Sequence, residues 1–168
     1  IDHPEPSLTE SGQVKMRILE VGVCGTDKEI VAFDYGNPPA GEHYLILGHE
    51  SLAEVIDVTP GVTGFKPGDL AVPTVRRPCG VASCVACNHH RQEFCYTGQF
   101  VERGINGRHG FMAEYVVEDQ SYLNSVPRAL RDVAVLVEPL TIAEKGMAQY
   151  WAVQKRLPWS DGGAGLRA

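Results

Sequence analysis

Two apolar runs flank a glycine, a histidine and a glutamate in the stretch Tyr44-Leu45-Ile46-Leu47-Gly48-His49-Glu50-Ser51-Leu52-Ala53-Glu54-Val55-Ile56-Asp57-Val58. Short apolar runs bounded by a turn residue are typical of strands, so we predict strands at 44–47 and 51–58. His49 and Glu50 would then lie at a strand end, where a rigid scaffold often presents reactive groups. Imidazole and carboxylate both bind zinc. Taken alone, a strand-end histidine and a solvated glutamate remain the simpler interpretation.

A second strand is predicted upstream, because residues 14–23 alternate between apolar and polar side chains. This strand leads to Cys24. Thr26 stands three residues before Glu29, which is the spacing of a capping box, so we predict Thr26 as the N-cap of a short helix through Phe33. In the first turn of that helix, Asp27 is placed to accept a hydrogen bond from the His49 imidazole, as carboxylates behind metal ligands do.

The rest of the chain predicts a mainly β protein with a few helices. Strand patterns recur at 70–75, 111–117 and 122–126, and 18 glycines and 11 prolines indicate many turns. Helical patterns follow at 129–137 and 140–157, with Pro139 at a position that suits the first turn of a helix.

Charge and hydropathy exclude two classes of partner. The 168 residues carry a net charge of −6, with a pI near 5.5, whereas nucleic acids and anionic membranes attract basic surfaces. No apolar run approaches the roughly 20 residues that span a bilayer. The printed sequence shows no secretory signal, so we expect a cytoplasmic protein whose cysteines stay reduced.

Four of the five cysteines lie within 17 residues of the chain, as Cys79, Cys84, Cys87 and Cys95. Four thiolates can close a tetrahedron around zinc without an open position, which makes a structural site. Such a site would order residues 76–110, which have little periodicity of their own. Two disulfides or free thiols are the alternatives. His89 and His90, in the same segment, are predicted to be solvated.

The fifth cysteine belongs to a second group of zinc-binding residue types, formed by Cys24, His49 and Glu50 with Glu138 as a further member. A catalytic zinc keeps one position open and therefore needs three protein ligands. These residues are distant in sequence, but each is predicted at a strand end or a strand-to-helix turn.

Several motifs in this order resemble the zinc-dependent medium-chain dehydrogenase/reductases of the alcohol dehydrogenase superfamily. They are Gly22-Val23-Cys24-Gly25-Thr26-Asp27, Gly48-His49-Glu50, Phe65-Lys66-Pro67-Gly68-Asp69 and the four-cysteine segment. A further set is similar to the glucose dehydrogenase branch: Thr74-Val75-Arg76-Arg77, Phe94-Cys95-Tyr96-Thr97-Gly98, His109-Gly110-Phe111-Met112-Ala113-Glu114-Tyr115 and Leu136-Val137-Glu138-Pro139-Leu140. The resemblance covers residues 14–158.

This resemblance implies a GroES-like irregular β-barrel domain at 1–158, with a zinc lobe at 76–110. It implies a catalytic zinc on Cys24, His49 and Glu50, and a structural zinc on Cys79, Cys84, Cys87 and Cys95. Glu138 matches a further ligand or a contact to zinc-bound water. Thr26 matches the hydroxyl that relays the proton of the reacting alcohol, and Glu102 matches a carboxylate that contacts sugar hydroxyls. Cys79 and Cys84 are separated by four residues, where the family usually has two.

The Rossmann nucleotide-binding domain of the family is absent from this sequence, so the resemblance implies a catalytic-domain fragment with a linker at 159–168. The full-length enzyme would be an NAD- or NADP-dependent aldose 1-dehydrogenase that oxidises the C1 hydroxyl of glucose to a lactone, and it would be a homo-oligomer. The fragment alone would be inactive. A zinc polyol or alcohol dehydrogenase is one alternative. A non-catalytic interaction module stabilised by zinc is another.

Overall fold

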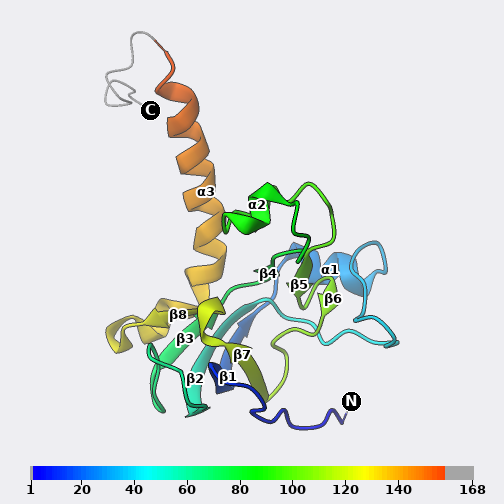
Figure 1. The fold of residues 1–168 in the computed structure, drawn as a ribbon, viewed down its shortest axis with the longest axis vertical. Helices are drawn as coiled ribbons and strands as arrows, with labels where there is room; N and C mark the ends of the chain where they lie inside the picture. Colours follow the sequence, from blue (N-terminus) through cyan, green and yellow to red (C-terminus); the bar gives the residue numbers. More distant parts are fainter. Residues whose placement is uncertain (1, 158–168) are drawn as a thin grey trace.

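The computed structural model describes residues 2–157 and is built on a five-stranded antiparallel sheet with strand order β7-β1-β2-β3-β8 (Figure 1). Its strands are β1 (Gln13–Gly22), β2 (Glu50–Val58), β3 (Leu70–Pro73), β7 (Tyr115–Asp119) and β8 (Leu123–Val126). The mainly β class predicted from the sequence is confirmed, as are the two long strands that lead to Cys24 and away from His49.

The alternation along β2 places its side chains in two different cores. Ala53 and Val55 pack with Val14 and Met16 of β1 and with Phe111. Leu52 lies in the other core, in a cluster completed by Leu70, Val72, Val126 and Ala134. Because successive side chains of a strand point to opposite faces, β2 is buried on both sides. It therefore holds His49 and Glu50, at its N-terminal end, in a fixed position.

A smaller sheet carries the cysteine-rich lobe. Its strands are β4 (Arg76–Arg77), β5 (Val101–Arg103) and β6 (Gly107–Arg108), and the lobe between β4 and β5 holds two short helices, α2 (Val85–Asn88) and η1 (Gln92–Phe94). Residues 76–110 therefore contain more regular structure than their lack of periodicity predicted, although every element in them is short.

The strands predicted at 44–47 and 111–117 differ most from the structure, and the one predicted at 70–75 ends at Pro73. Residues 44–47 lie outside the sheet, because Gly48 adopts a φ of +90° and interrupts the ladder just before β2 begins. Their carbonyl groups accept instead from a neighbouring loop, in Gly110 N–H to Ile46 (2.7 Å) and Met112 N–H to Leu47 (2.9 Å). The strand predicted at 111–117 starts only at Tyr115, since this loop occupies its expected beginning.

The first helix is also displaced from its prediction. Helix α1 spans Gly25–Val31, so its N-cap is Cys24, and Thr26 lies inside the first turn. Asp27 replaces Thr26 as the capping group, because its Oδ2 accepts from the backbone N–H of Cys24 at 2.9 Å. The helix ends before Phe33, which has a φ of +62°.

The chain ends in two helical segments, joined without a break. A series of 3₁₀ turns, η3 (Arg128–Leu136), follows β8 and runs into α3 (Val137–Gln154), while the short turn η2 (Gln120–Tyr122) precedes β8. Pro139 is the third residue of α3 rather than the first. Helix α3 contains no buried residue and projects from the sheet beside the lobe (Figure 1). The predicted linker at 159–168 and the stop at Pro158 lie outside the described residues.

A buried charge cluster joins the two sheets. Glu118 of β7 is 2% exposed and accepts from Arg77 Nη2 at 2.6 Å and from Arg103 Nε at 2.9 Å, while Arg108 Nη2 lies 3.2 Å from its other oxygen. Burial alone would raise the pKa of this carboxyl group, but the three guanidinium groups outweigh burial and lower it. Among residues 2–157, no helix is long and apolar enough to cross a membrane.

Candidate metal and substrate site

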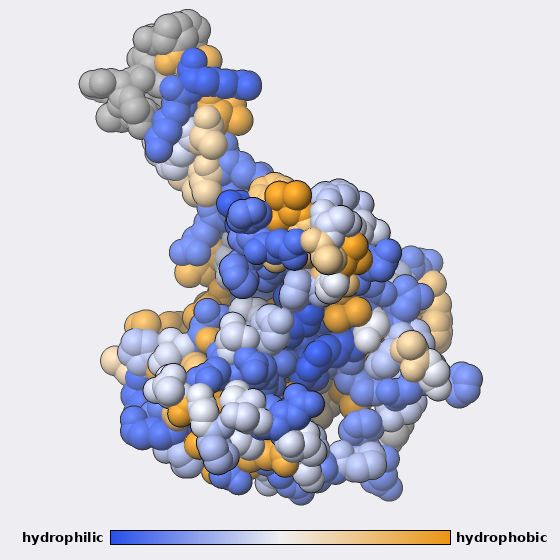
Figure 2. Space-filling model, viewed as in Figure 1, coloured by the Kyte–Doolittle hydropathy of each residue, from blue (hydrophilic) through white to orange (hydrophobic). Residues whose placement is uncertain are grey.

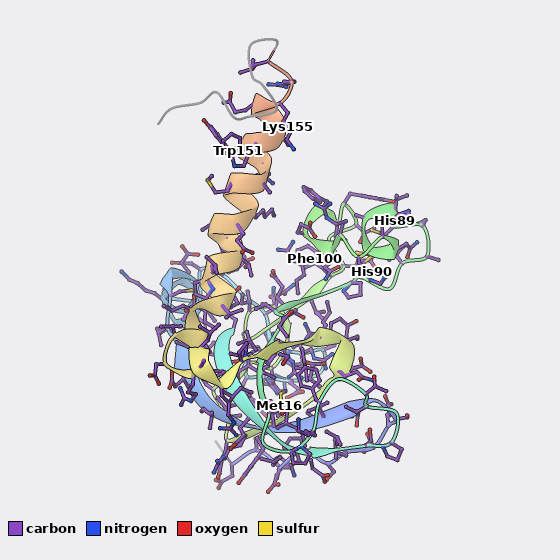
Figure 3. The ribbon with its side chains drawn as sticks, turned by 90° about the vertical axis from the view of Figure 1, so that its left-hand side faces the viewer. Met16, His89, His90, Phe100, Trp151 and Lys155 are labelled. Atoms are coloured by element: carbon purple, nitrogen blue, oxygen red, sulfur yellow. The ribbon has the colours of Figure 1, made fainter. Side chains whose placement is uncertain are left out.

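A cleft of about 1010 Å³ is bordered by the first turn of α1, the beginning of β2, the lobe and α3. Its lining includes all six residues predicted to act at a catalytic centre: Cys24, Thr26, His49, Glu50, Glu102 and Glu138. Figure 2 shows the lobe beside the narrow column of α3, with hydrophobic atoms exposed on the lobe. In Figure 3, the end of α3, with Trp151 in its last turn and Lys155 directly after it, extends beyond the lobe, which carries His89 and His90.

The cleft is centred on a thiol and an imidazole. Sγ of Cys24 lies 3.1 Å from Nε2 of His49, and His49 is 5% exposed. Cys24 caps α1 at the end of β1, and His49 directly precedes β2, whose residue Glu50 pairs with Gly22. The antiparallel pairing of β1 and β2 is therefore what brings two residues 25 positions apart into contact.

Asp27 stands behind this pair. Its Oδ1 lies 3.5 Å from Nδ1 of His49, and both atoms are buried without a hydrogen-bond partner among the described residues. A proton on Nδ1 would face this carboxylate and leave the lone pair of Nε2 directed at Cys24. Oxygen, nitrogen and sulfur atoms of Asp27, His49 and Cys24 all lie within 4.8 Å of one another. This donor set fits a zinc ion bound by sulfur and imidazole with a carboxylate behind the histidine.

Glu50 borders the same cleft, but its carboxylate is not part of that 4.8 Å group. Its position depends on Gly22, the residue opposite it on β1. A Cβ atom at position 22 would lie 2.3 Å from Oε2 of Glu50. The sequence alone does not reveal this role of Gly22, because it depends on the strand register.

Glu138, the second residue of α3, faces the same centre. Burial raises the pKa of its carboxyl group, His49 acts in the opposite direction, and the negative charge of Glu50 adds to the rise. All three residues line the same cleft. Thr26 lines the cleft as well, and its hydroxyl is free of the capping role that was predicted for it.

Glu102 is 7% exposed and is held by Arg76, its partner on the neighbouring strand β4. Arg76 donates from Nε to Oε1 of Glu102 at 2.9 Å. Its Nη2 lies 2.8 Å from the same oxygen. The guanidinium carbon lies 4.1 Å from the ring centre of Phe100. No described residue bonds Oε2 of Glu102, so this acceptor is left for a ligand in the cleft.

The four lobe cysteines come together as predicted from their spacing. All are free thiols, and their sulfur atoms lie within 4.8 Å of one another, Cys79 included. Cys84 and Cys87 are buried, whereas His89 and His90 are exposed, as predicted. The wider spacing between Cys79 and Cys84 thus does not keep Cys79 from the cluster.

The protonation of this cluster also fits a cation. A hydrogen bond with the Thr97 hydroxyl, 3.2 Å away, lowers the pKa of the Cys95 thiol to about 6. At Cys87 the backbone N–H of Cys79 favours the thiolate, but burial and the other three thiols outweigh it and raise the pKa to about 12. Only part of the cluster therefore ionises unaided, and a divalent cation would stabilise all four thiolates.

Comparisons with known proteins agree with this architecture. The family model of the alcohol dehydrogenase GroES-like domain matches residues 10–128. A glucose 1-dehydrogenase from Methanocella arvoryzae is 46% identical over 159 residues, which are 95% of this chain and 43% of that protein. One from Thermoproteus tenax is 50% identical over 144 residues, 86% of this chain and 39% of that protein.

A solved structure, Haloferax mediterranei glucose dehydrogenase in complex with NADP, Zn and gluconolactone, matches with a TM-score of 0.85 and 38% identity. The match covers 95% of this chain and 44% of that one. The chain thus spans less than half the length of these relatives. The matched residues 10–128 include the antiparallel sheet, the Cys24–His49 pair and the four-cysteine lobe, and on this ground the chain belongs to the alcohol dehydrogenase GroES-like domain family.

Proposed function

We propose that this chain forms the metal- and substrate-binding part of an NAD- or NADP-dependent dehydrogenase that oxidises the C1 hydroxyl of glucose to the lactone. The observation that carries the proposal is the convergence of Cys24, His49, Glu102 and Glu138 on one cleft. The relatives that match along nearly the whole chain are named glucose 1-dehydrogenases, and the Haloferax mediterranei enzyme holds NADP, Zn and gluconolactone.

In this proposal, Cys24, His49 and Glu50 hold a catalytic zinc, and Glu138 is a further ligand or contacts a water on the metal. A zinc ion bound there would act as a Lewis acid that lowers the pKa of the sugar hydroxyl. Asp27 keeps the proton of His49 on Nδ1, so that Nε2 stays available. The four lobe cysteines hold a second, structural zinc.

The chain's own groups bind the sugar and move its proton. Thr26, whose hydroxyl lines the cleft, accepts the proton of the C1 hydroxyl and passes it toward solvent. The hydrogen on C1 leaves with its electron pair to the nicotinamide, and the C1–O bond becomes the carbonyl of the lactone. Oε2 of Glu102 accepts from a sugar hydroxyl, because Arg76 occupies the other oxygen. A sugar epimer that covers this acceptor without donating a hydrogen bond to it loses about 1–3 kcal/mol of binding.

We also propose a cytoplasmic protein, because its five cysteines are all free. Assembly into a homo-oligomer stays a prediction from the family resemblance. Surface for such contacts is available on α3, where Leu140, Ile142 and Met147 are more than half exposed.

The test is aldose-dependent reduction of NAD⁺ and NADP⁺, followed at 340 nm. The chain is assayed after fusion to the part of the Haloferax mediterranei enzyme that it does not match. We expect oxidation of glucose with one or both nucleotides, and its loss after chelation. Glu102→Ala should impair aldoses selectively. Equal losses on glucose and on a simple alcohol would favour a general zinc alcohol dehydrogenase, and no turnover of any alcohol would contradict the proposal.

A further inference from the structure

The lobe packs its four thiols closely enough for covalent pairing as well as for metal binding. Sγ of Cys84 lies 3.8 Å from Sγ of Cys95, and the backbone N–H of Cys79 donates to Sγ of Cys87 at 3.5 Å. All four sulfur atoms lie within 4.8 Å of one another. Bonded sulfur atoms are about 2.05 Å apart, so Cys84 and Cys95 need to approach by less than about 2 Å to form a disulfide.

The four thiols differ in their access to solvent. Cys79 and Cys95 are half-buried, whereas Cys84 and Cys87 are buried. A dissolved oxidant therefore reaches Cys79 and Cys95 first, and each of these has buried thiols beside it. An accessible cysteine with a second cysteine next to it is the usual arrangement of a redox-sensitive site, because the second thiol completes a disulfide before further oxidation occurs.

The lobe has no apolar core that would hold its shape without the cysteines. Its helices α2 and η1 contain four and three residues, and within 79–95 only Cys84 and Cys87 are buried. The apolar side chains of Val85 and Phe94 are 62% and 50% exposed. The bonds that join the four sulfur atoms therefore decide the structure of the lobe, whether a metal or a disulfide supplies them.

The fifth cysteine, Cys24, has different neighbours. Its sulfur is grouped with donor atoms of Asp27 and His49, and no second thiol belongs to that group among residues 2–157. An oxidised Cys24 thus has no nearby thiol with which to form a disulfide. Reversible pairing is a property of the lobe alone.

The lobe borders the cleft through η1. Gln92, Glu93 and Phe94 line the cleft and directly precede Cys95. The Phe94 ring centre lies 5.4 Å from Nζ of Lys145, on the facing helix α3. A movement of Cys95 toward Cys84 therefore shifts the wall of the cleft that faces α3.

We propose that the lobe is a redox-sensitive modification site, in which hydrogen peroxide joins Cys84 to Cys95 in a disulfide that excludes the structural metal. Cys79 and Cys87 alone cannot complete a four-ligand zinc site. In a reducing compartment such a disulfide is transient, which suits a response to peroxide. The proposal involves only the lobe and does not depend on the reaction catalysed at the cleft.

The reaction is a two-electron oxidation of two thiolates. The sulfur of Cys95 attacks one oxygen of the peroxide, the O–O bond breaks, and a sulfenic acid and a hydroxide ion result. The sulfur of Cys84 then attacks the sulfenic sulfur, so that the S–S bond forms and the S–O bond breaks with loss of a second hydroxide. Two protons from solvent convert both hydroxide ions to water.

Mass spectrometry of the 168-residue chain tests the pairing. Reduced, metal-free protein is treated with a small excess of hydrogen peroxide, alkylated and digested with trypsin. Cleavage after Arg91 separates Cys84 from Cys95, so their disulfide links peptides 77–91 and 92–103. We expect this link to form first, in Cys24→Ser as in the parent chain, and dithiothreitol to remove it. A first link from Cys95 to another cysteine, links only between chains, or only sulfinic and sulfonic acids would overturn the proposal.

Metal release is followed in Cys24→Ser, in which the lobe is the remaining zinc site. A chromogenic chelator reports free zinc while peroxide is added. We expect about one zinc per chain to be released as the Cys84–Cys95 link appears, and to rebind after reduction. Cys95→His keeps a zinc ligand at this position but removes the pair, so it should release zinc more slowly. Equal rates in the two proteins, or zinc retained beside a formed link, would contradict the exclusion.

NMR tests whether oxidation reaches the cleft. The backbone amide signals of Phe94 and Lys145 are compared between the reduced, zinc-bound chain and the oxidised chain. We expect both to shift, because Phe94 precedes Cys95 and contacts Lys145, while the signal of Met16 in the sheet core stays in place. Shifts that stop at residue 95 and leave Lys145 unchanged would show that the modification stays within the lobe and does not alter the cleft.

Discussion

Sγ of Cys24 and Nε2 of His49 lie 3.1 Å apart, although 25 residues separate them in the chain. The contact follows from the register of β1 against β2, in which Gly22 and Glu50 are opposite each other. Both strands are anchored in the core, so the two donor atoms are held together before any metal arrives. Preorganised ligands of this kind should bind a metal independently of the lobe.

Metal content tests this independence. We expect two zinc ions per chain, by elemental analysis of protein prepared with zinc. Cys24→Ser should retain only the lobe zinc, and Cys84→Ser only the other, because the two ligand sets share no residue. One ion, lost only on substitution of a lobe cysteine, would instead support an interaction module stabilised by zinc.

A substitution at Gly22 tests whether the position of the Glu50 carboxylate matters for metal binding. In Gly22→Ala the new methyl group would lie 2.3 Å from Oε2 of Glu50, so this carboxylate must move. We call the proposed metal site at Cys24, His49 and Glu50 the first site. We expect its affinity for the metal to fall about 10- to 100-fold, the range for a disturbed ligand environment, in a competition with a fluorescent chelator. Gly25→Ala is the control, since a Cβ there meets nothing within 4 Å. Equal effects of the two variants would contradict the role of Gly22.

The sequence predicts those parts of this site that depend on residues close together in the chain. Four cysteines within 17 residues, and a histidine at the start of an alternating strand, need no long-range information. The sequence predicts Thr26 as the capping group of α1, because Glu29 completes a capping-box motif. In the structure Asp27 is the capping group instead: one oxygen of its carboxylate accepts from the Cys24 N–H, and the other faces the buried His49.

Features that depend on register or on positive φ were missed. Residues 44–47 are apolar enough for a strand, but Gly48, at φ +90°, directs the chain out of the ladder, and a Cβ there would lie 2.8 Å from Met112 Cγ. The Arg76–Glu102 pair is likewise invisible in the sequence, because 26 residues separate its members and only the β4–β5 pairing aligns them.

The buried Glu118 cluster predicts a pH dependence of stability. The folded-state pKa of Glu118 is lower than its unfolded value of about 4.5, so the carboxylate stabilises the fold above that pH. This contribution is lost as the pH falls through the folded pKa. Glu118→Gln should cost about 3–5 kcal/mol at pH 7, because it leaves buried guanidinium groups unpaired. The difference from the parent protein should shrink at pH 3–4.

Urea unfolding of metal-free protein at both pH values measures this difference. Glu5→Gln is the control, since Glu5 pairs with Lys15 at the surface, where such pairs contribute about 0–1 kcal/mol. A Glu118→Gln penalty that stays constant from pH 7 to pH 3 would show that the carboxylate charge is not its source.

The last prediction concerns His109, which holds the segment before His49. Its Nδ1 accepts from Ile46 N–H at 3.2 Å, so its proton is on Nε2, which lies 2.8 Å from Glu42 Oε2. The ring of Tyr44 stacks on it at 5.0 Å. The adjoining backbone bonds from 110–112 to 46–48 continue the contact up to the residue before His49. His109 thus fixes the start of the segment that presents the imidazole.

In His109→Phe, the Ile46 N–H loses its acceptor, which costs about 1–3 kcal/mol and lets residues 46–48 shift. We expect weaker binding of the first-site metal with unchanged lobe metal, measured by Co²⁺ titration of protein whose lobe is filled with zinc. His109→Asn should recover part of the affinity, because its side-chain oxygen can accept from Ile46. Tyr44→Phe, which loses only the hydroxyl bonded to His3, should behave like the parent protein. If His109→Phe lowered stability but left the first-site affinity intact, His109 would hold the fold without positioning His49.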